Sequence, residues 1–128
     1  MFDIKRRTRM ADRAIKYSAN SLDFAQKVAG FSAKAVELKA PFSGRPEAHR
    51  NQHDLYVVIS GKAKVKTGEL TGKVDEISEG EYRSDEMIVN EEHTLQIGES
   101  LLIPAGLAHT VIVESGVFAQ WVFKIDKR

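Results

Sequence analysis

The 128-residue sequence contains no cysteine and no apolar run long enough to cross a membrane as a helix. Without cysteine, the chain forms no disulfide, thiolate zinc cluster, iron–sulfur centre or cysteine nucleophile. Any metal must therefore be bound by His, Asp or Glu. The sequence also lacks a strong excess of charge. Its 19 basic and 18 acidic residues give a formal net charge of +1, which does not indicate a nucleic-acid-binding protein.

The composition is that of a globular protein, with 42% hydrophobic and 29% charged residues. The length suits one domain. Residues 1–9 are basic, but no apolar segment follows them, so the N-terminus does not resemble a signal peptide. We therefore expect a cytoplasmic protein without a membrane partner. We expect residues 1–30 to form an N-terminal arm with a short helix, and residues 31–128 to form the main domain.

The predicted helix follows a basic, solvated arm over residues 1–17. Asn20 or Ser21 can cap it, because their side-chain oxygens can accept hydrogen bonds from the free amides of a first helical turn. Apolar residues recur at helical spacing over 22–28, and Gly30 can end the helix.

After residue 30 the pattern changes from helical spacing to a period of two, which is typical of β-strands. The segments with this character are 33–38, 55–59, 62–66, 93–97, 101–103, 109–113 and 117–125. Residues 67–92 are rich in acidic side chains and are predicted to be a polar surface excursion with one or two short strands. Many short strands punctuated by Gly and Pro indicate an all-β sandwich or barrel.

One motif lies in the second half of the chain, over residues 98–109, with the pattern G-x5-P-x-G-x2-H. Pro104 ends a strand because it cannot donate to the hydrogen-bond ladder. Gly106 permits a positive φ in the turn that follows. His109 then opens the next strand on the same face as apolar residues, so its imidazole is expected to point into an apolar interior.

A second motif lies upstream, where Glu47, His49, Asp54 and Gly61 keep the spacing of the pattern H-x-H-x4-E-x6-G. Glu47 stands at the first His position and Asp54 at the Glu position. Over residues 33–125 the two motifs together resemble the cupin superfamily, with small single-domain bacterial cupins as the closest likeness. The resemblance implies an all-β cupin double-stranded β-helix, a jelly-roll barrel, preceded by the short N-terminal helix.

The resemblance also implies that Glu47, His49, Asp54 and His109 converge inside the barrel as a metal site. Two imidazoles and two carboxylates suit a divalent Fe, Mn, Ni, Cu or Zn ion, and the sequence does not select among them. The implied function is metal-dependent binding of, or action on, a small polar organic molecule. Oxygenase, isomerase and lyase chemistry all stay open, and so does whether the protein is an enzyme. A looser likeness to cupins of sugar metabolism suggests the alternative, a non-enzymatic cupin that binds or senses a sugar-like ligand without metal.

Some of these assignments have alternatives in the sequence itself. Asp is one methylene shorter than Glu, so Asp54 can instead hydrogen-bond a loop, and a turn one residue different would make His53 the ligand. Glu47 adds a charge that would be unfavourable in an empty barrel, which argues for a metal or a cationic partner. Alternatively, Glu47 pairs with Arg45 or Arg50 near the mouth and binds nothing.

Other residues complete the predicted site and surface. Tyr56 is expected beside Asp54, as a wall of the cavity or as a catalytic proton donor. His93 lies outside both motifs and is expected not to be a ligand, and Arg83 is expected to be solvated rather than to hold a substrate. The apolar last strand, with Phe118, Trp121 and Phe123, predicts a homodimer in which an edge strand is buried against a second copy.

Overall fold

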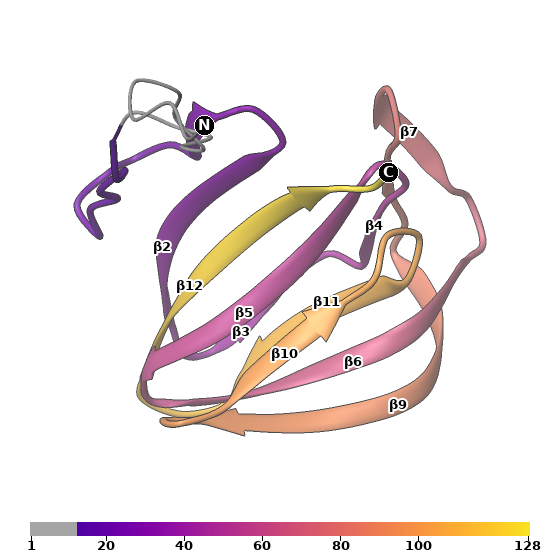
Figure 1. The fold of residues 1–128 in the computed structure, drawn as a ribbon. Coiled ribbons are helices and arrows are strands. Elements are labelled where there is room, and N and C mark those ends of the chain that lie inside the picture. The colour runs from indigo at the N-terminus through magenta and orange to yellow at the C-terminus, as the bar shows by residue number, and fades with distance from the viewer. Residues whose placement is uncertain (1–12) are drawn as a thin grey trace, which may run out of the picture.

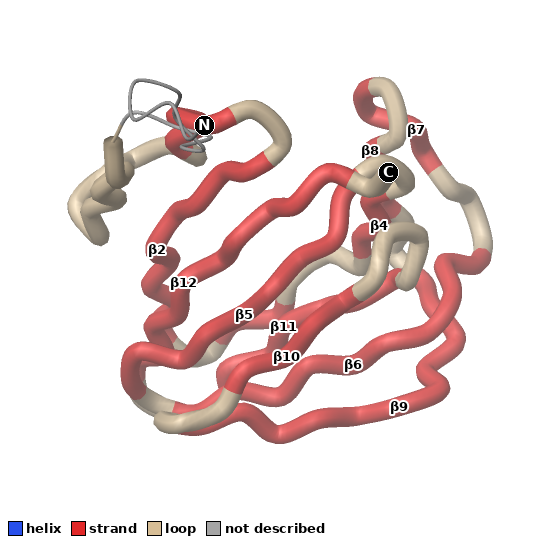
Figure 2. The backbone as a smooth tube through the Cα atoms, in the orientation of Figure 1, coloured by secondary structure: helices blue, strands red, loops and turns tan. Residues whose placement is uncertain are grey.

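The computed structural model describes residues 13–128, which contain β-strands and no helix. The strands form two antiparallel sheets, visible as two layers in Figure 1 and as the red tube in Figure 2. The first sheet has the order β1 (Ala25–Val28), β2 (Phe31–Lys39), β12 (Val117–Asp126), β5 (Gln52–Ser60) and β10 (Ser100–Ile103). The second has the order β7 (Asp75–Ser78), β8 (Glu81–Arg83), β4 (Glu47–His49), β11 (Ala108–Val113), β6 (Lys62–Thr71) and β9 (Glu86–Gln96), with β3 (Phe42–Ser43) paired to β11.

The core lies between the two sheets, as the period-two pattern predicted. Phe118 of β12 and Ile103 of β10 come from the first sheet, while Val65 of β6 and Val113 of β11 come from the second, and all four are fully buried. Alternation along each strand sends one set of side chains into this core and the next set outward. The all-β prediction is therefore confirmed. Among the described residues there is no helix long and apolar enough to span a membrane.

The predicted N-terminal helix is wrong. Ala25–Val28 instead forms β1, which pairs antiparallel with β2 through a turn at Gly30, where φ is +80°. The positive φ that suits a helix C-terminus also suits a tight hairpin, so Gly30 did not discriminate between the two. A helix of about nine residues is marginal by itself, whereas the free edge of β2 offers hydrogen bonds to a strand. The predicted basic arm lies partly in residues 1–12, outside the described residues.

The segment 67–92 contains more strand than its composition indicated. Two short strands, β7 and β8, are present as predicted, but β6 continues to Thr71 and β9 begins at Glu86. These two long strands pair along their whole length, from Lys62 opposite Gln96 to Thr71 opposite Glu86. Most side chains of β9 are exposed, so the strand does not need apolar residues. Its polar composition therefore did not indicate a strand.

The last strand is not an edge strand, contrary to the argument for a homodimer. β12 lies between β2 and β5 and pairs with both. Phe118 is part of the core, while Trp121 and Phe123 lie on the face of the sheet that points away from it and stack with ring centroids 5.8 Å apart. The backbone of β12 is therefore already paired on both sides, and the homodimer stays a prediction.

Candidate metal site

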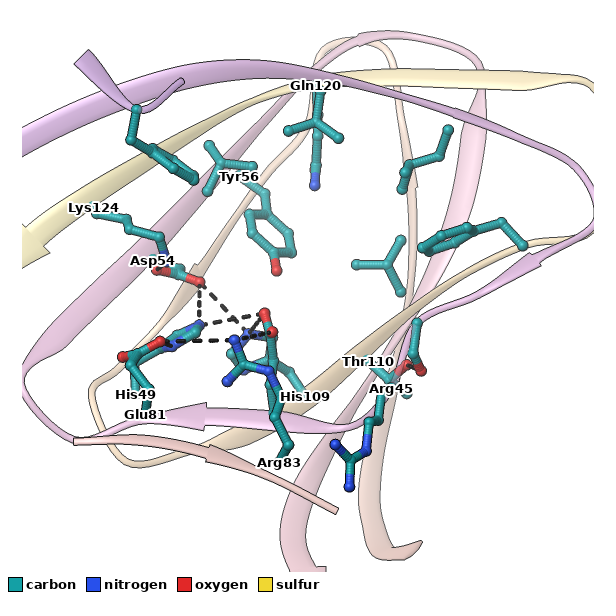
Figure 3. A pocket seen from close by; sticks show the side chains of 18 of the residues that line it. Arg45, His49, Asp54, Tyr56, Glu81, Arg83, His109, Thr110, Gln120 and Lys124 are labelled. Atoms are coloured by element: carbon teal, nitrogen blue, oxygen red, sulfur yellow. Dashed lines mark hydrogen bonds and ion pairs between the residues drawn. The ribbon is translucent and has the colours of Figure 1, made fainter. Parts of the chain in front are cut away.

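Four side chains with metal-ligating atoms meet inside the barrel. Three of them, His49, Asp54 and His109, are labelled in Figure 3. Glu47 and His49 share one face of β4 because side chains two residues apart on a strand point the same way. Asp54 points inward from β5, and His109 points inward from β11, directly opposite Glu47 in the ladder. One atom from each residue lies within 4.8 Å of all the others.

The nitrogen–oxygen separations in this cluster are regular. Nε2 of His49 lies 3.3 Å from Oε1 of Glu47 and 3.2 Å from Oδ2 of Asp54. Nε2 of His109 lies 3.3 Å and 3.5 Å from the same two oxygens. Ligand atoms at about 2.0–2.1 Å from one ion in a tetrahedral site are about 3.3–3.4 Å apart. The cluster therefore has the dimensions of a site for a first-row divalent ion.

The two Nε2 atoms provide a second test of that fit. Both are buried and have no hydrogen-bond partner within the described part of the chain. The carboxylate oxygens beside them are at ion-pair distance but outside hydrogen-bond geometry. Buried polar atoms without a partner are rare, because the desolvation penalty of about 1–3 kcal/mol is then uncompensated. An ion bound by all four residues would satisfy both atoms at once, so the residues present fit a metal ion.

The far side of each imidazole is held in place. Nδ1 of His49 lies 2.7 Å from Oε1 of Glu81, and Nδ1 of His109 lies 3.0 Å from the carbonyl oxygen of Leu107. A carboxylate and a carbonyl only accept, so each Nδ1 must donate. In the neutral ring, Nε2 then carries the lone pair that a metal binds. Both rings therefore present a ligand atom to the cluster.

Each carboxylate is also fixed by a cation on its outer oxygen. Arg83 lies 3.2 Å from Oε2 of Glu47, and Lys124 lies 3.0 Å from Oδ1 of Asp54. The other oxygen of each carboxylate, Oε1 or Oδ2, is the one that faces the imidazoles. All four candidate ligands thus have a supporting contact that leaves one atom directed at the centre, which is typical of metal sites.

The pKa values in the cluster reflect this crowding. Burial acts to raise the pKa of the Glu47 and Asp54 carboxyls, but the imidazoles of His109 and His49 outweigh it and hold both pKa values well below their usual range. Burial acts to lower the pKa of His49, but Asp54 and Glu47 raise it to about 9. The same carboxylates raise the pKa of His109. Without a metal, protons on the imidazoles therefore balance the carboxylate charge.

Comparisons with known proteins identify the architecture. No family model and no curated protein matches the chain. Among solved structures, the cupin domain of Schizosaccharomyces pombe Cnp3 aligns over 90% of this chain and 71% of its own, with a TM-score of 0.62 and 12% sequence identity. The chain has the cupin fold.

Two further cupin-fold structures align with it. Hydroquinone 1,2-dioxygenase PnpCD, in complex with Cd2+ and 4-hydroxybenzonitrile, covers 79% of this chain and 60% of its own, with a TM-score of 0.58 and 15% identity. The DMSP lyase DddQ from Ruegeria pomeroyi DSS-3 covers 75% of this chain, with a TM-score of 0.52 and 14% identity. This chain spans only 38% of that lyase. At these identities the likeness establishes the fold alone.

The cupin barrel encloses a cavity of about 680 Å³ next to the cluster. Its walls are largely apolar, and its mouth carries Arg45, which binds Asp75 and Asp85. Tyr56 points into this cavity and lies edge-on to His109, with ring centroids 6.2 Å apart (Figure 3). Burial, together with the charges of Asp54 and Glu47, raises the pKa of Tyr56 well above its usual value. Its hydroxyl therefore keeps its proton at neutral pH.

The structure brings together all the residues that the two cupin motifs predicted. Asp54, not His53, faces the cavity, and Nδ1 of His53 instead accepts a hydrogen bond of 2.9 Å from the backbone of Ala105. His93 lies on β9, outside the cluster, and its side chain is 37% exposed. Glu47 contacts Arg83 rather than either of the arginines expected at the mouth.

Three functional contacts were missed because they lie outside both motifs. Glu81 and Arg83 occupy β8, within the segment that had been assigned to the surface, and Lys124 belongs to the last strand. The predicted solvation of Arg83 is wrong, because its side chain is only 20% exposed and contacts Glu47. The sequence did contain a signal for these contacts. Glu81 and Arg83 are two residues apart, so in a strand both charged side chains lie on the same face.

Proposed function

We propose that this cupin binds a divalent first-row metal ion through Glu47, His49, Asp54 and His109, and that it acts on a small polar organic molecule in the adjoining cavity. The observation that carries the proposal is the pair of buried Nε2 atoms that have no hydrogen-bond partner among residues 13–128, both beside the same two carboxylate oxygens. A metal ion satisfies both atoms at once, and two carboxylates neutralise its charge.

When bound, the metal would supply Lewis acidity and, with more than four ligands, coordination positions for a substrate oxygen or for dioxygen. Two imidazoles and two carboxylates suit Fe, Mn, Ni, Cu or Zn. Oxygenase, isomerase and lyase chemistry are all compatible with such a set. Two of the aligned cupin structures are a dioxygenase and a lyase by name, which supports chemistry of this range.

Tyr56 is the residue of this chain that we propose as a hydrogen-bond donor to the bound molecule. Its hydroxyl keeps its proton because burial raises its pKa, and it faces the same cavity as the candidate ligands. It therefore serves as a hydrogen-bond donor to a bound oxygen atom, and not as a base. Lys124 and Arg83 hold Asp54 and Glu47 in place through ion pairs.

A second candidate function, metal-free binding of a sugar-like ligand, has one observation in its favour. His49 has a pKa of about 9, so without a metal it is protonated at neutral pH between Glu47 and Asp54. The protonated cluster is then electrostatically balanced. In such a protein these residues would hydrogen-bond the ligand instead of coordinating an ion.

Elemental analysis of untagged protein purified without chelator distinguishes the two functions. The metal-dependent function predicts about one Fe, Mn, Ni, Cu or Zn ion per chain. His109→Ala and Asp54→Ala should each abolish stoichiometric metal binding while circular dichroism shows an unchanged fold, and the control His93→Ala should retain the metal. An absence of metal after reconstitution, or full occupancy in both cluster variants, would refute the proposed site.

A further inference from the structure

The cavity-facing side chains of two central strands form an ordered polar–apolar–polar row. On β12 these side chains are Gln120, Val122 and Lys124, which all line the cavity. The ladder with β5 sets Lys124 opposite Asp54 and Val122 opposite Tyr56. The row therefore runs from the candidate metal site, past an apolar and aromatic middle, to a single amide at Gln120.

Gln120 is the unexplained member of this row. It is only 2% exposed, and its Oε1 is buried without a hydrogen-bond partner among residues 13–128. Figure 3 shows its side chain pointing into the cavity, on the far side of Tyr56 from the cluster. A buried amide without a partner destabilises a fold, and an apolar side chain of similar size would fill the same position without that penalty. The fold therefore gives no reason for an amide here.

The surroundings of Gln120 define what could reach it. Val36, Leu38 and Phe42 line the cavity together with Val111 and Val122, so its walls are apolar between the two polar ends. Gln120 and Lys124 are four positions apart on β12, which corresponds to about 13 Å along the strand. Side chains on one face of a strand project roughly parallel to one another, so the two polar ends of the row lie about this far apart, and a molecule of one or two rings can span the distance.

We propose that Gln120 determines ligand specificity by hydrogen-bonding the end of the ligand remote from the metal. The ligand class is an amphipathic molecule with an oxygen donor at one end, an apolar ring or short chain in the middle, and a hydroxyl, carbonyl or amide at the other end. This inference deepens the proposed function and rests on it for the metal-bound end of the ligand. The amide of Gln120 both donates and accepts, so it accommodates any of these remote groups.

Two hydroxamates that differ by one hydroxyl group test the inference. Benzohydroxamate and 4-hydroxybenzohydroxamate both chelate through the hydroxamate, and only the second carries a polar group at the remote end. Their Kd values are measured by titration into Co(II)-loaded wild-type protein, Gln120→Leu, and the exposed control Gln96→Leu. In wild type and in the control, the para-hydroxyl should tighten binding about three- to tenfold, the effect of one neutral hydrogen bond. In Gln120→Leu that gain should vanish, while benzohydroxamate binds within about twofold of wild type.

The melting temperature provides a readout that does not depend on a metal. Gln120→Leu should raise the Tm of the metal-free protein by about 3–5 °C, because it removes an unsatisfied buried amide. A lower Tm would show that the amide supports the fold, and would overturn the inference. The inference would also be overturned if wild type bound the two hydroxamates equally well, or if Gln120→Leu still bound 4-hydroxybenzohydroxamate more tightly than benzohydroxamate. If wild type does not bind Co(II), the proposed function fails instead, which separates the two failures.

Discussion

Glu81 on β8 accepts a hydrogen bond from His49 on β4, with Oε1 2.7 Å from Nδ1. The two strands are neighbours in the ladder, where Glu81 lies directly opposite His49. This contact fixes the orientation of the imidazole and its tautomer, so that Nε2 faces the other candidate ligands. A residue outside both sequence motifs thus determines how one of the motif residues can bind a metal.

Removing this contact should weaken metal binding without removing a ligand. We expect Glu81→Ala to reduce the affinity about 10- to 100-fold, the usual effect of losing the partner of a ligating histidine. Glu81→Gln should lose less, because its amide oxygen still accepts from Nδ1. Competition with a chromophoric chelator measures the affinity. Glu79→Ala, at an exposed position two residues earlier, is the matched control and should bind as wild type does.

The ion pair between Lys124 and Asp54 leads to a prediction about stability. Asp54 is 2% exposed, and its Oδ1 lies 3.0 Å from Nζ of Lys124. Lys124→Met removes the cation beside Oδ1 of Asp54 and leaves the protonated imidazoles beside Oδ2, so the metal-free protein should lose up to about 3 kcal/mol of unfolding free energy. Metal should restore much of this loss, because the ion provides the missing positive charge.

Urea unfolding with and without metal measures both effects of the Lys124 substitution. The control is Lys64→Met, which breaks a pair of 2.9 Å with Glu114 between two largely exposed side chains. Exposed pairs contribute about 0–1 kcal/mol, so this variant should differ little from wild type in either state. An equal loss in the two variants would mean that burial of Asp54 does not govern the stability.

The four candidate ligands were predicted from the resemblance to the cupin motifs, and the directions of their side chains can be read locally. The spacing of glycine and proline over residues 98–109 fixes a turn and a strand start, and alternation then sets the direction of His109. Glu47 and His49 are likewise oriented by their own strand. Directions set within one strand can be read from one stretch of sequence, so these residues could be placed before their partners were known.

The contacts that support these ligands could not be predicted, because they depend on pairing between strands distant in sequence. Glu81 contacts His49 across a separation of 32 residues, and Lys124 contacts Asp54 across 70. Nothing near either residue indicates its partner. The segment Ala25–Val28 shows the same limit, since it is a strand only because the edge of β2 was available to it. Tertiary pairing overrode its helical pattern.

Metal affinity should rise with pH, because protons and metal compete for the imidazoles. The carboxylates raise the pKa of His49 to about 9, so at pH 7 the metal-free protein carries a proton there that the metal must displace. Each pH unit between about 6 and 9 should therefore tighten binding about tenfold per displaced proton, and the effect should level off above about 9. Calorimetric titration in buffers with different ionisation enthalpies counts the released protons. A pH-independent affinity would contradict the binding of metal by His49.

The same pKa predicts how the metal-free protein responds to pH. The pKa of His49 is higher in the folded than in the unfolded state, so protonated His49 stabilises the fold. Its contribution is fully present below the unfolded value of about 6.5, and is lost as the pH rises through about 9. The Tm of the metal-free protein should accordingly fall over this range. The metal-loaded protein should not show this fall, because its His49 is already deprotonated.

Gly61, the last residue of the upstream motif, closes the turn between β5 and β6 with a φ of +79°. A Cβ at this position would collide with the carbonyl oxygen of Val117 and lie 2.9 Å from Cα of Phe118, at the start of β12. Gly61→Ala should therefore combine backbone strain with displacement of the strand that carries Gln120 and Lys124.

Gly98→Ala is the control that separates the two effects of the Gly61 substitution. Gly98 also has a positive φ, of +91°, but a Cβ there would have no atom within 4 Å. Its substitution should destabilise the protein by about 1–2 kcal/mol through strain alone. Gly61→Ala should exceed that by a further 1–3 kcal/mol, the usual effect of overpacking. Urea unfolding of both variants measures the difference. Equal losses would show that the turn moves away from β12 without penalty, and that Gly61 is required only for its φ.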